Sequence, residues 1–204
     1  MKCCAKRNPE EPVGVVCIKN GKYDVVEYSE LSDELAKKKA PGEDSLYFEL
    51  GNILIFMLSS KKLLELCKDT EGLNKLYHVA HKKVETWNDE LQKAVKPETN
   101  NAYKFELFMH NFLPFCDAGK FGAIKVKRED EFGPVKNANP ADGGLGVDSP
   151  NSARALLLAQ HNSWVQKQCP DRKAAIADME IEVDGLLSYE GEGQEFVRQC
   201  KELK

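Results

Sequence analysis

Lys136 is the residue whose surroundings best suit chemistry on a phosphate. It follows the Gly133-Pro134 turn, and four charged residues, Arg128 to Glu131, come just before that turn. A lysine held in this way can meet a phosphate as a point charge. Residues 122–127 alternate like a strand, so Lys136 lies beyond a strand end, where α/β proteins bind ligands. The alternative is a solvated charged turn, which the spacing alone favours because charge runs usually face water.

Three other polar residues could contact a sugar or its phosphate. Glu27 lies at the end of an apolar strand, where a carboxylate can accept hydrogen bonds from two adjacent sugar hydroxyls. Asn52 follows Gly51, and its amide, which both donates and accepts, suits an acetamido group or a hydroxyl. Lys104 begins a segment rich in aromatic residues. Each has an ordinary alternative: a solvated carboxylate, a turn-forming Gly-Asn pair and a surface charge, respectively.

Other motifs do not match a known kind of site. His78 and His81 are neighbours at helical spacing, but a metal site needs further ligands at a recognisable spacing. The glycine-rich residues 142–146 lack the Gly-Lys-Ser/Thr ending of a phosphate-binding loop and do not follow a strand. No Ser-His-Asp or Cys-His arrangement can be argued from spacing. We therefore predict neither a metal ligand nor a nucleophile in this chain.

The composition predicts a soluble globular protein. Of the 204 residues, 42% are hydrophobic and 30% are charged, which fits one domain or one domain with a small second lobe. The net charge of −4 gives no reason to expect a nucleic acid or an anionic membrane as a partner. The longest apolar run, residues 53–58, is too short to span a bilayer. Seven widely spaced cysteines, without a Cys-x-x-Cys motif, favour reduced thiols and hence a cytoplasmic location.

The pattern of apolar residues and turns predicts an α/β fold with a mixed sheet and flanking helices. Asn20-Gly21 predicts a hairpin between strands at 13–18 and 23–28. Helix caps are expected at Ser29 or Ser32, and at Ser59 or Ser60. The other expected elements are a strand at 45–56 with a turn near Gly51-Asn52, helices at 73–83 and 101–116, short strands at 84–87, 92–95 and 122–127, a loop at 139–151, a helix at 152–168, a strand at 179–187 and a short helix from 194.

Several motifs, taken in order, make the chain resemble the eukaryotic UDP-N-acetylglucosamine pyrophosphorylases. The most specific is Arg128 to Ala138, which reads Arg-Glu-Asp-Glu-Phe-Gly-Pro-Val-Lys-Asn-Ala. The others are Val13 to Cys17, Val25 to Glu30, Gly51 to Ile53, His78 to Lys83, Lys96-Pro97, Lys104 to Phe108 and Ser188 to Gly193. Each motif is modest alone, but order and approximate spacing agree across residues 13–193.

The resemblance implies which residues bind the substrates. Glu27 and Tyr28 would correspond to a sugar-binding pair, and Asn52 to another sugar contact. Lys104 would correspond to a lysine near the UTP phosphates, and Lys136 to a lysine on the sugar phosphate.

The aromatic segment helps to shape the acetamido pocket in this family. Phe108 keeps that character, whereas His110 stands where a second phenylalanine is expected. This departure leaves the preference between N-acetylglucosamine and N-acetylgalactosamine phosphates open.

The implied reaction is uridylyl transfer, in which N-acetylglucosamine 1-phosphate attacks UTP and pyrophosphate leaves. Mg²⁺ is implied as a cofactor, with ligands in the family's N-terminal nucleotide-binding half. That half carries a glycine-rich signature that this sequence lacks. We therefore expect the later half of a Rossmann-like nucleotide-diphospho-sugar transferase: residues 1–138 as the sugar-binding half of the core and 139–204 as a C-terminal helix and strand lobe.

We expect no turnover by this chain alone, because UTP binding would need the absent half. Two alternatives stay open: a related UDP-sugar pyrophosphorylase that uses another sugar, and a non-catalytic binding or regulatory module.

Overall fold

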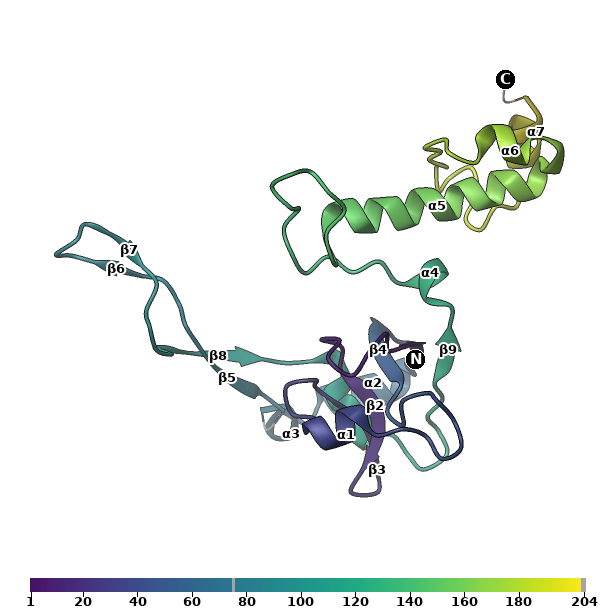
Figure 1. The fold of residues 1–204 in the computed structure, drawn as a ribbon. Coiled ribbons are helices and arrows are strands. Elements are labelled where there is room, and N and C mark those ends of the chain that lie inside the picture. Colours follow the sequence, from purple (N-terminus) through teal and green to yellow (C-terminus); the bar gives the residue numbers. More distant parts are fainter. Residues whose placement is uncertain (75, 203–204) are drawn as a thin grey trace. The chain divides into compact units, whose positions relative to one another are not determined.

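The computed structural model describes residues 1–74 and 76–202. The chain divides into two compact units, Met1–Lys125 and Val126–Lys204 (Figure 1). The first is built on a sheet and the second on helices, which confirms the predicted α/β class. None of the helices among the described residues combines the length and the apolar character that a membrane span requires.

A five-stranded sheet organises the first unit. Its strands, in spatial order, are β3 (Lys22–Val26), β2 (Val15–Lys19), β4 (Leu50–Ile55), β1 (Lys2–Ala5) and β9 (Ile124–Val126). The pairs β3/β2, β2/β4 and β4/β1 are antiparallel. Cys3, Cys4, Val15 and Ile53 are buried on the three central strands, so the centre of the sheet supplies the core of this unit.

The predicted hairpin is confirmed. Asn20 and Gly21 both have positive φ, 52° and 75°, which is the backbone that a two-residue hairpin turn needs to match the twist of its strands. The turn sets a register in which Val15 of β2 pairs with Val26 of β3. Since Glu27 comes directly after β3, the hairpin determines where that carboxylate stands.

The turn predicted at Gly51-Asn52 is wrong, because both residues lie inside β4. Gly51 pairs with Cys4 on one side and with Val15 on the other. A Cβ on Gly51 would lie 3.0 Å from Val13 Cγ1 and 3.1 Å from the Cys4 carbonyl oxygen. The glycine therefore permits a close approach between neighbouring segments instead of a change of direction.

Short helices follow β3 and β4. Ser32 caps α1 (Asp33–Lys37) and Ser59 caps α2 (Ser60–Cys67), each by accepting a hydrogen bond from a backbone N–H of the first turn. Both are among the expected caps. The other helices among the described residues of the unit are α3 (Thr70–Asn74) and the 3₁₀ helix η1 (Met109–Phe115).

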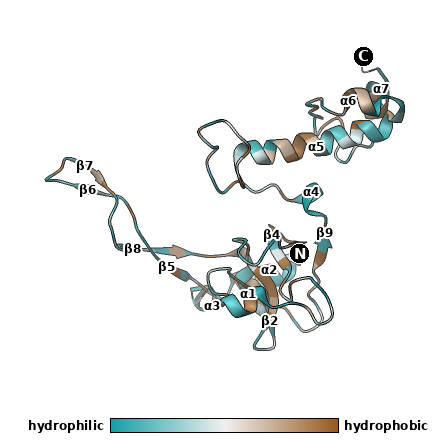
Figure 2. Cartoon of the chain, viewed as in Figure 1, coloured by the Kyte–Doolittle hydropathy of each residue, from teal (hydrophilic) through white to brown (hydrophobic). Residues whose placement is uncertain are grey.

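The helix predicted at 73–83 is present only at residues 73 and 74, which end α3, and is wrong at 76–83; residue 75 lies outside the described residues. The helix predicted at 101–116 is wrong in its first half, whereas residues 109–115 form the 3₁₀ helix η1. A ribbon replaces the parts that are wrong: β5 (His78–Lys82) pairs with β8 (Ala102–Glu106), and β6 (Thr86–Asn88) pairs with β7 (Lys93–Val95). The ribbon runs away from the sheet (Figure 1) and carries apolar residues on β5 and β8 (Figure 2). Cross-strand pairing decides the structure here: Val79 opposes Phe105, and the rings of His81 and Tyr103 stack with centroids 4.5 Å apart.

The second unit centres on the long helix α5 (Pro150–Gln168). Ser149 caps it through a capping box with Ser152, so the predicted helix is confirmed. The other helices are α4 (Arg128–Glu131), η2 (Pro170–Arg172), α6 (Lys173–Ile176) and α7 (Gln194–Glu202). The buried cluster of this unit comprises Val165, Cys169, Ile176, Val183, Phe196 and Cys200.

The strand predicted at 179–187 is wrong. This segment has an irregular backbone that forms hydrogen bonds with side chains of α5. Asn162 Nδ2 donates to the carbonyl oxygens of Ile176 and Met179, both at 2.7 Å. The backbone N–H of Val183 donates to His161 Nδ1 at 3.0 Å. Backbone groups that pair with a helix in this way have no need of a neighbouring strand.

The second unit begins at Val126, earlier than the boundary expected after Ala138. The backbone N–H groups of Lys136 and Asn137 both donate to the Asp148 carbonyl oxygen, at 2.7 and 3.0 Å. Gln160 of α5 donates to the Asp130 carbonyl oxygen at 2.8 Å. These hydrogen bonds attach residues 128–138 to the helical unit.

Candidate functional site

A polar cavity of about 250 Å³ lies beyond the end of β3. Its charged and imidazole-bearing lining residues are Lys19, Asp24, Glu27, Glu30, His78 and His110. Four elements bring them together: the β2/β3 hairpin, the turn that follows it, the start of β5, and η1, which packs on β3. Carboxylates, imidazoles and an aromatic ring in one cavity are the groups that bind a polar small molecule.

Glu27 stands at this cavity because of a tight turn and a glycine. The Glu27 carbonyl oxygen accepts hydrogen bonds from the N–H groups of Glu30 and Leu31, at 2.9 and 3.2 Å. Its carboxylate lies over Gly14, where a Cβ would be 3.1 Å from Glu27 Oε1. The side chain is 26% exposed, so it is partly desolvated yet open to a ligand.

His110, on η1, forms the buried wall of the cavity. Its side chain is 3% exposed, and its Nε2 lies 3.6 Å from Glu27 Oε1. Burial lowers the pKa of His110 from its ordinary value, opposed by the nearby carboxylates of Asp24 and Glu30. The ring is therefore neutral at pH 7. Among the described residues, no hydrogen-bond partner reaches its Nδ1.

Phe108 lies beside His110, as the residue that precedes η1. The two rings stack, with centroids 5.0 Å apart and planes 13° from parallel. His78 adds a third ring at 5.7 Å from Phe108, and its Nδ1 is 3.6 Å from Glu30 Oε1. Asn111 Nδ2 donates to the Leu76 carbonyl oxygen at 2.7 Å, which fixes the base of the ribbon against η1.

Asn52 is connected to this cavity indirectly. It is buried in β4, and its backbone N–H donates to the carbonyl oxygen of Gly14 at 2.8 Å. Its side-chain Oδ1 accepts from the N–H of Leu54 at 3.0 Å. Asn52 thus holds Gly14, over which the Glu27 carboxylate lies, while its own side chain supports the strand.

The remaining predicted residues lie elsewhere. Tyr28 follows Glu27 and is half exposed. Lys104 lies on β8 of the ribbon, and its Nζ contacts Glu106 Oε1 at 2.7 Å, a hydrogen bond that lowers the pKa of Glu106. Lys136 belongs to the second unit. The structure therefore brings Glu27 and Phe108 together, and the assignments of Tyr28, Lys104 and Lys136 stay predictions.

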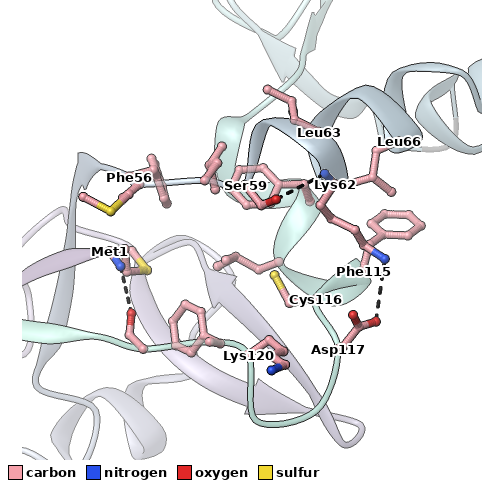
Figure 3. Close-up of a pocket in the computed structure, with 16 residues that line it drawn as sticks. Met1, Phe56, Ser59, Lys62, Leu63, Leu66, Phe115, Cys116, Asp117 and Lys120 are labelled. Carbon is pink, nitrogen blue, oxygen red and sulfur yellow. Dashed lines mark hydrogen bonds and ion pairs between the residues drawn. The ribbon is translucent and has the colours of Figure 1, made fainter.

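A larger cavity, of about 400 Å³, lies between α2, η1 and the segment before β9, and its lining is mostly apolar (Figure 3). Phe56, Leu63, Leu66 and Phe115 line it. Its charged groups include Lys62 and Asp117, which form an ion pair at 3.6 Å. It contains none of the residues that the sequence singled out, and its apolar walls do not suit a sugar phosphate. We therefore assign the candidate site to the smaller, polar cavity.

Sequence reasoning missed Asp24, Glu30 and His78 as neighbours of Glu27. Asp24 and Glu30 flank Glu27 within a few residues, so proximity along the chain was a usable signal. The spacing of His78 and His81 raises only a metal pair, and the motif His78 to Lys83 carries no role in the resemblance. The packing of η1 on β3 brings His110 to Glu27, and no spacing in the sequence encodes that contact.

Comparisons with known proteins agree with the motifs. A family model described as "UTP--glucose-1-phosphate uridylyltransferase" matches residues 1–179. The UDP-N-acetylhexosamine pyrophosphorylase-like protein 1 of Homo sapiens is 38% identical and covers 100% of this chain, which spans 41% of that protein. The UDP-N-acetylglucosamine pyrophosphorylase of Saccharomyces cerevisiae is 34% identical over 94% of this chain and 38% of its own length.

Solved structures give the same result. The uridine diphosphate N-acetylglucosamine pyrophosphorylase of Trypanosoma brucei, in complex with an inhibitor, aligns with a TM-score of 0.74 at 30% identity, over 98% of this chain and 40% of that one. A putative UDP-N-acetylglucosamine pyrophosphorylase from Entamoeba histolytica aligns with a TM-score of 0.63 at 28% identity. The resemblance drawn from the motifs is confirmed, and the chain spans about 40% of the length of the relatives it matches.

Proposed function

Since this chain belongs to the UTP–glucose-1-phosphate uridylyltransferase family, we propose that it supplies the sugar-phosphate side of a uridylyltransferase that makes UDP-N-acetylglucosamine and pyrophosphate. The observation that carries the proposal is the polar cavity in which the partly buried carboxylate of Glu27 meets the stacked rings of Phe108 and His110. A carboxylate that accepts from hydroxyls, beside a flat aromatic wall, is a surface that suits a sugar.

The proposed reaction needs no general base from this chain. The phosphate oxygen of N-acetylglucosamine 1-phosphate attacks the α-phosphorus of UTP, and the bond from that phosphorus to the pyrophosphate oxygen breaks. The attacking phosphate is already an anion near pH 7, because its second pKa is about 6. The task of the protein is therefore alignment and neutralisation of charge. Glu27 and Tyr28 would hold the sugar, and Asn52 would hold the strand beneath Glu27.

Lysines would neutralise the phosphates. We assign Lys136 to the sugar phosphate and Lys104 to the UTP phosphates, both on the motifs in which they stand. Mg²⁺ would add positive charge at the phosphates. Among the described residues no three His, Cys, Asp or Glu side chains converge to hold a metal ion, so we assign the Mg²⁺ ligands to a nucleotide-binding region outside this sequence.

We propose that this region is the partner that completes the enzyme. The support is the relatives' extra length, since the chain spans only about 40% of them. This chain alone would bind a sugar phosphate without turning it over. We also propose a cytoplasmic location, which the seven free cysteines support.

Two other functions remain candidates. A related UDP-sugar pyrophosphorylase with another sugar is favoured by His110, which replaces the expected phenylalanine. A non-catalytic binding or regulatory module is the other candidate. Binding assays with N-acetylglucosamine, N-acetylgalactosamine and glucose 1-phosphates show which sugar the site prefers. Turnover by a longer protein distinguishes an enzyme from a non-catalytic module.

Glu27→Gln tests the site directly. The substitution keeps the size of the side chain and removes the charge that strengthens hydrogen bonds from sugar hydroxyls. A hydrogen bond to a charged group contributes about 1.5–3 kcal/mol, so we expect Kd for N-acetylglucosamine 1-phosphate to rise roughly 10- to 100-fold. Isothermal titration calorimetry on the 204-residue chain measures this change.

Glu34→Gln is the matched control. Glu34 is exposed on α1 of the same unit, and it makes the same change of net charge away from the cavity. We expect its Kd to equal that of the unchanged protein. Equal affinities for all three proteins would remove Glu27 from the sugar site.

A further inference from the structure

The backbone of Lys136 is tied to the residues just before the long helix α5. The N–H groups of Lys136 and Asn137 both donate to the carbonyl oxygen of Asp148, at 2.7 and 3.0 Å. The side-chain amide of Asn137 donates to the neighbouring carbonyl oxygen, that of Val147, at 2.9 Å. Three donors from two consecutive residues therefore meet two consecutive acceptors, and Asn137 supplies two of the three.

Asp148 presents its carbonyl oxygen from an uncommon backbone conformation. Its φ is 48°, in the left-handed region that few residues other than glycine adopt, and the residue is 8% exposed. Such a conformation persists only where the surrounding structure enforces it, and it is concentrated at functional sites. The following residue, Ser149, caps α5, so the acceptor for Lys136 is fixed to the start of a long helix.

The loop between these two segments is closed by side chains from both of its ends. Asn139 Oδ1 accepts a hydrogen bond from the backbone N–H of Asn151 at 2.9 Å. Asn151 Nδ2 donates to the carbonyl oxygens of Gly143 and Gly144, at 3.1 and 3.0 Å. Because Asn151 belongs to the first turn of α5, these bonds attach the loop to the helix at further points.

A fixed backbone matters for a lysine that has to meet a phosphate. The ammonium group is a point charge at the end of a flexible four-carbon stem. The position of the backbone therefore sets the region that this charge can reach. A charge that is already close to the place of its phosphate loses less freedom when the ligand binds.

We propose that Asn137 is a positioning residue for Lys136: its hydrogen bonds to the segment before α5 fix the backbone from which the lysine reaches the phosphate of a sugar 1-phosphate. The inference rests on the proposed function, in which Lys136 contacts that phosphate. The side-chain amide of Asn137 is engaged with the Val147 carbonyl oxygen, so its effect on the ligand passes through Lys136.

A double-mutant cycle tests this dependence. We measure Kd for N-acetylglucosamine 1-phosphate by isothermal titration calorimetry with Asn137→Ala, with Lys136→Ala and with both substitutions together. We expect Kd to rise roughly 3- to 10-fold in Asn137→Ala, as for the loss of one hydrogen bond, and about tenfold or more in Lys136→Ala, which loses a charged contact. The double variant should bind as Lys136→Ala does. Additive effects on affinity, or an unchanged Kd in Asn137→Ala, would overturn the proposal.

Two comparisons separate positioning from a general loss of structure. Asn100→Ala removes a bond of the same kind, from an exposed asparagine amide to the His81 carbonyl oxygen at 3.0 Å, and should leave Kd unchanged. N-acetylglucosamine without its phosphate should bind Asn137→Ala and the unchanged protein equally, because Lys136 contacts only the phosphate. Weaker binding of this sugar by Asn137→Ala, or an equal loss of affinity in Asn100→Ala, would contradict the positioning role.

Hydrogen exchange in the unaltered protein tests the same bonds without a variant. The N–H groups of Lys136 and Asn137 both have an acceptor, so we expect them to exchange about tenfold or more slowly than in an unfolded chain. Exchange of both groups at the unfolded rate would show that the backbone of Lys136 is not held, and the proposal would be wrong.

The proposed function fails in a distinguishable way. If Lys136→Ala leaves Kd unchanged, the assignment of Lys136 to the sugar phosphate falls, and this inference falls with it. If Lys136→Ala weakens binding while Asn137→Ala does not, only the inference about Asn137 is wrong.

Discussion

Gly14→Ala should weaken the sugar site without altering any residue that contacts the ligand. A Cβ at this position would lie 2.9 Å from Val25 Cγ1 and 3.1 Å from Glu27 Oε1. Ordinary carbon contacts are about 3.5–4.0 Å, so both neighbours must move by several tenths of an ångström. Val25 is 5% exposed on β3 and has little room, whereas the half-buried Glu27 carboxylate can swing toward the cavity.

The expected magnitude follows from these two contacts. Overpacking a core position costs about 1–3 kcal/mol, and for a chain of this size each kcal/mol lowers Tm by about 2–4 °C. The displaced carboxylate would also lose part of its hydrogen bonding to the sugar, which we expect to raise Kd about tenfold. Thermal unfolding and calorimetry with N-acetylglucosamine 1-phosphate measure the two effects separately.

Gly122→Ala is the control for this change. A Cβ on Gly122 would meet nothing within 4 Å, so the same substitution should leave stability and affinity essentially unchanged. If Gly14→Ala matches the unchanged protein in both Tm and Kd, the close approach of Glu27 to Gly14 is not what positions the carboxylate.

Two predictions concern pH and the second unit. Burial lowers the pKa of His110 below its unfolded value of about 6.5. As pH falls, the unfolded chain therefore binds more protons than the folded chain does. The free energy of unfolding should then decrease from about pH 6.5 downward. Urea titrations at acidic and neutral pH should show a smaller difference for His110→Phe, and an equal difference would contradict this origin. His161, whose pKa burial also lowers, contributes to the pH dependence that remains. In a longer protein that carries the nucleotide-binding region, Lys136→Ala should lower kcat about tenfold or more by removing a charge contact to the phosphate, and unchanged steady-state kinetics would remove Lys136 from the site.

Local signals predicted the elements that local chemistry determines. Asn20-Gly21 forms the hairpin because these two residue types adopt positive φ readily, and Ser59 caps α2 because its hydroxyl pairs with a backbone N–H of the first turn. Neither depends on distant contacts.

The wrong predictions concern segments whose secondary structure depends on contacts with residues distant in the sequence. Phe105 and Phe108 share a helical spacing, but β5 pairs with the segment that holds Phe105 and makes it a strand. The alternation at 179–187 is typical of a strand, yet hydrogen bonds from Asn162 and His161 of α5 bind this segment instead. The periodicity of a sequence shows where its apolar side chains fall, but it does not predict which segment packs against them.

The candidate site also has parts that the sequence predicted and parts that only the packing determines. The resemblance placed Glu27 and Phe108 in one function, and the structure places both at one cavity. Residue spacing could not join them, because the packing of η1 on β3 creates the contact. For the same reason the unpaired Nδ1 of His110 is visible only in three dimensions.

A crystal structure of the chain with N-acetylglucosamine 1-phosphate tests the central claim most directly. The account predicts sugar density in the cavity beyond β3, with hydroxyls within hydrogen-bond distance of the Glu27 carboxylate and the acetamido group against the rings of Phe108 and His110. Sugar bound in the apolar cavity beside α2, or an empty polar cavity at saturating ligand, would contradict it.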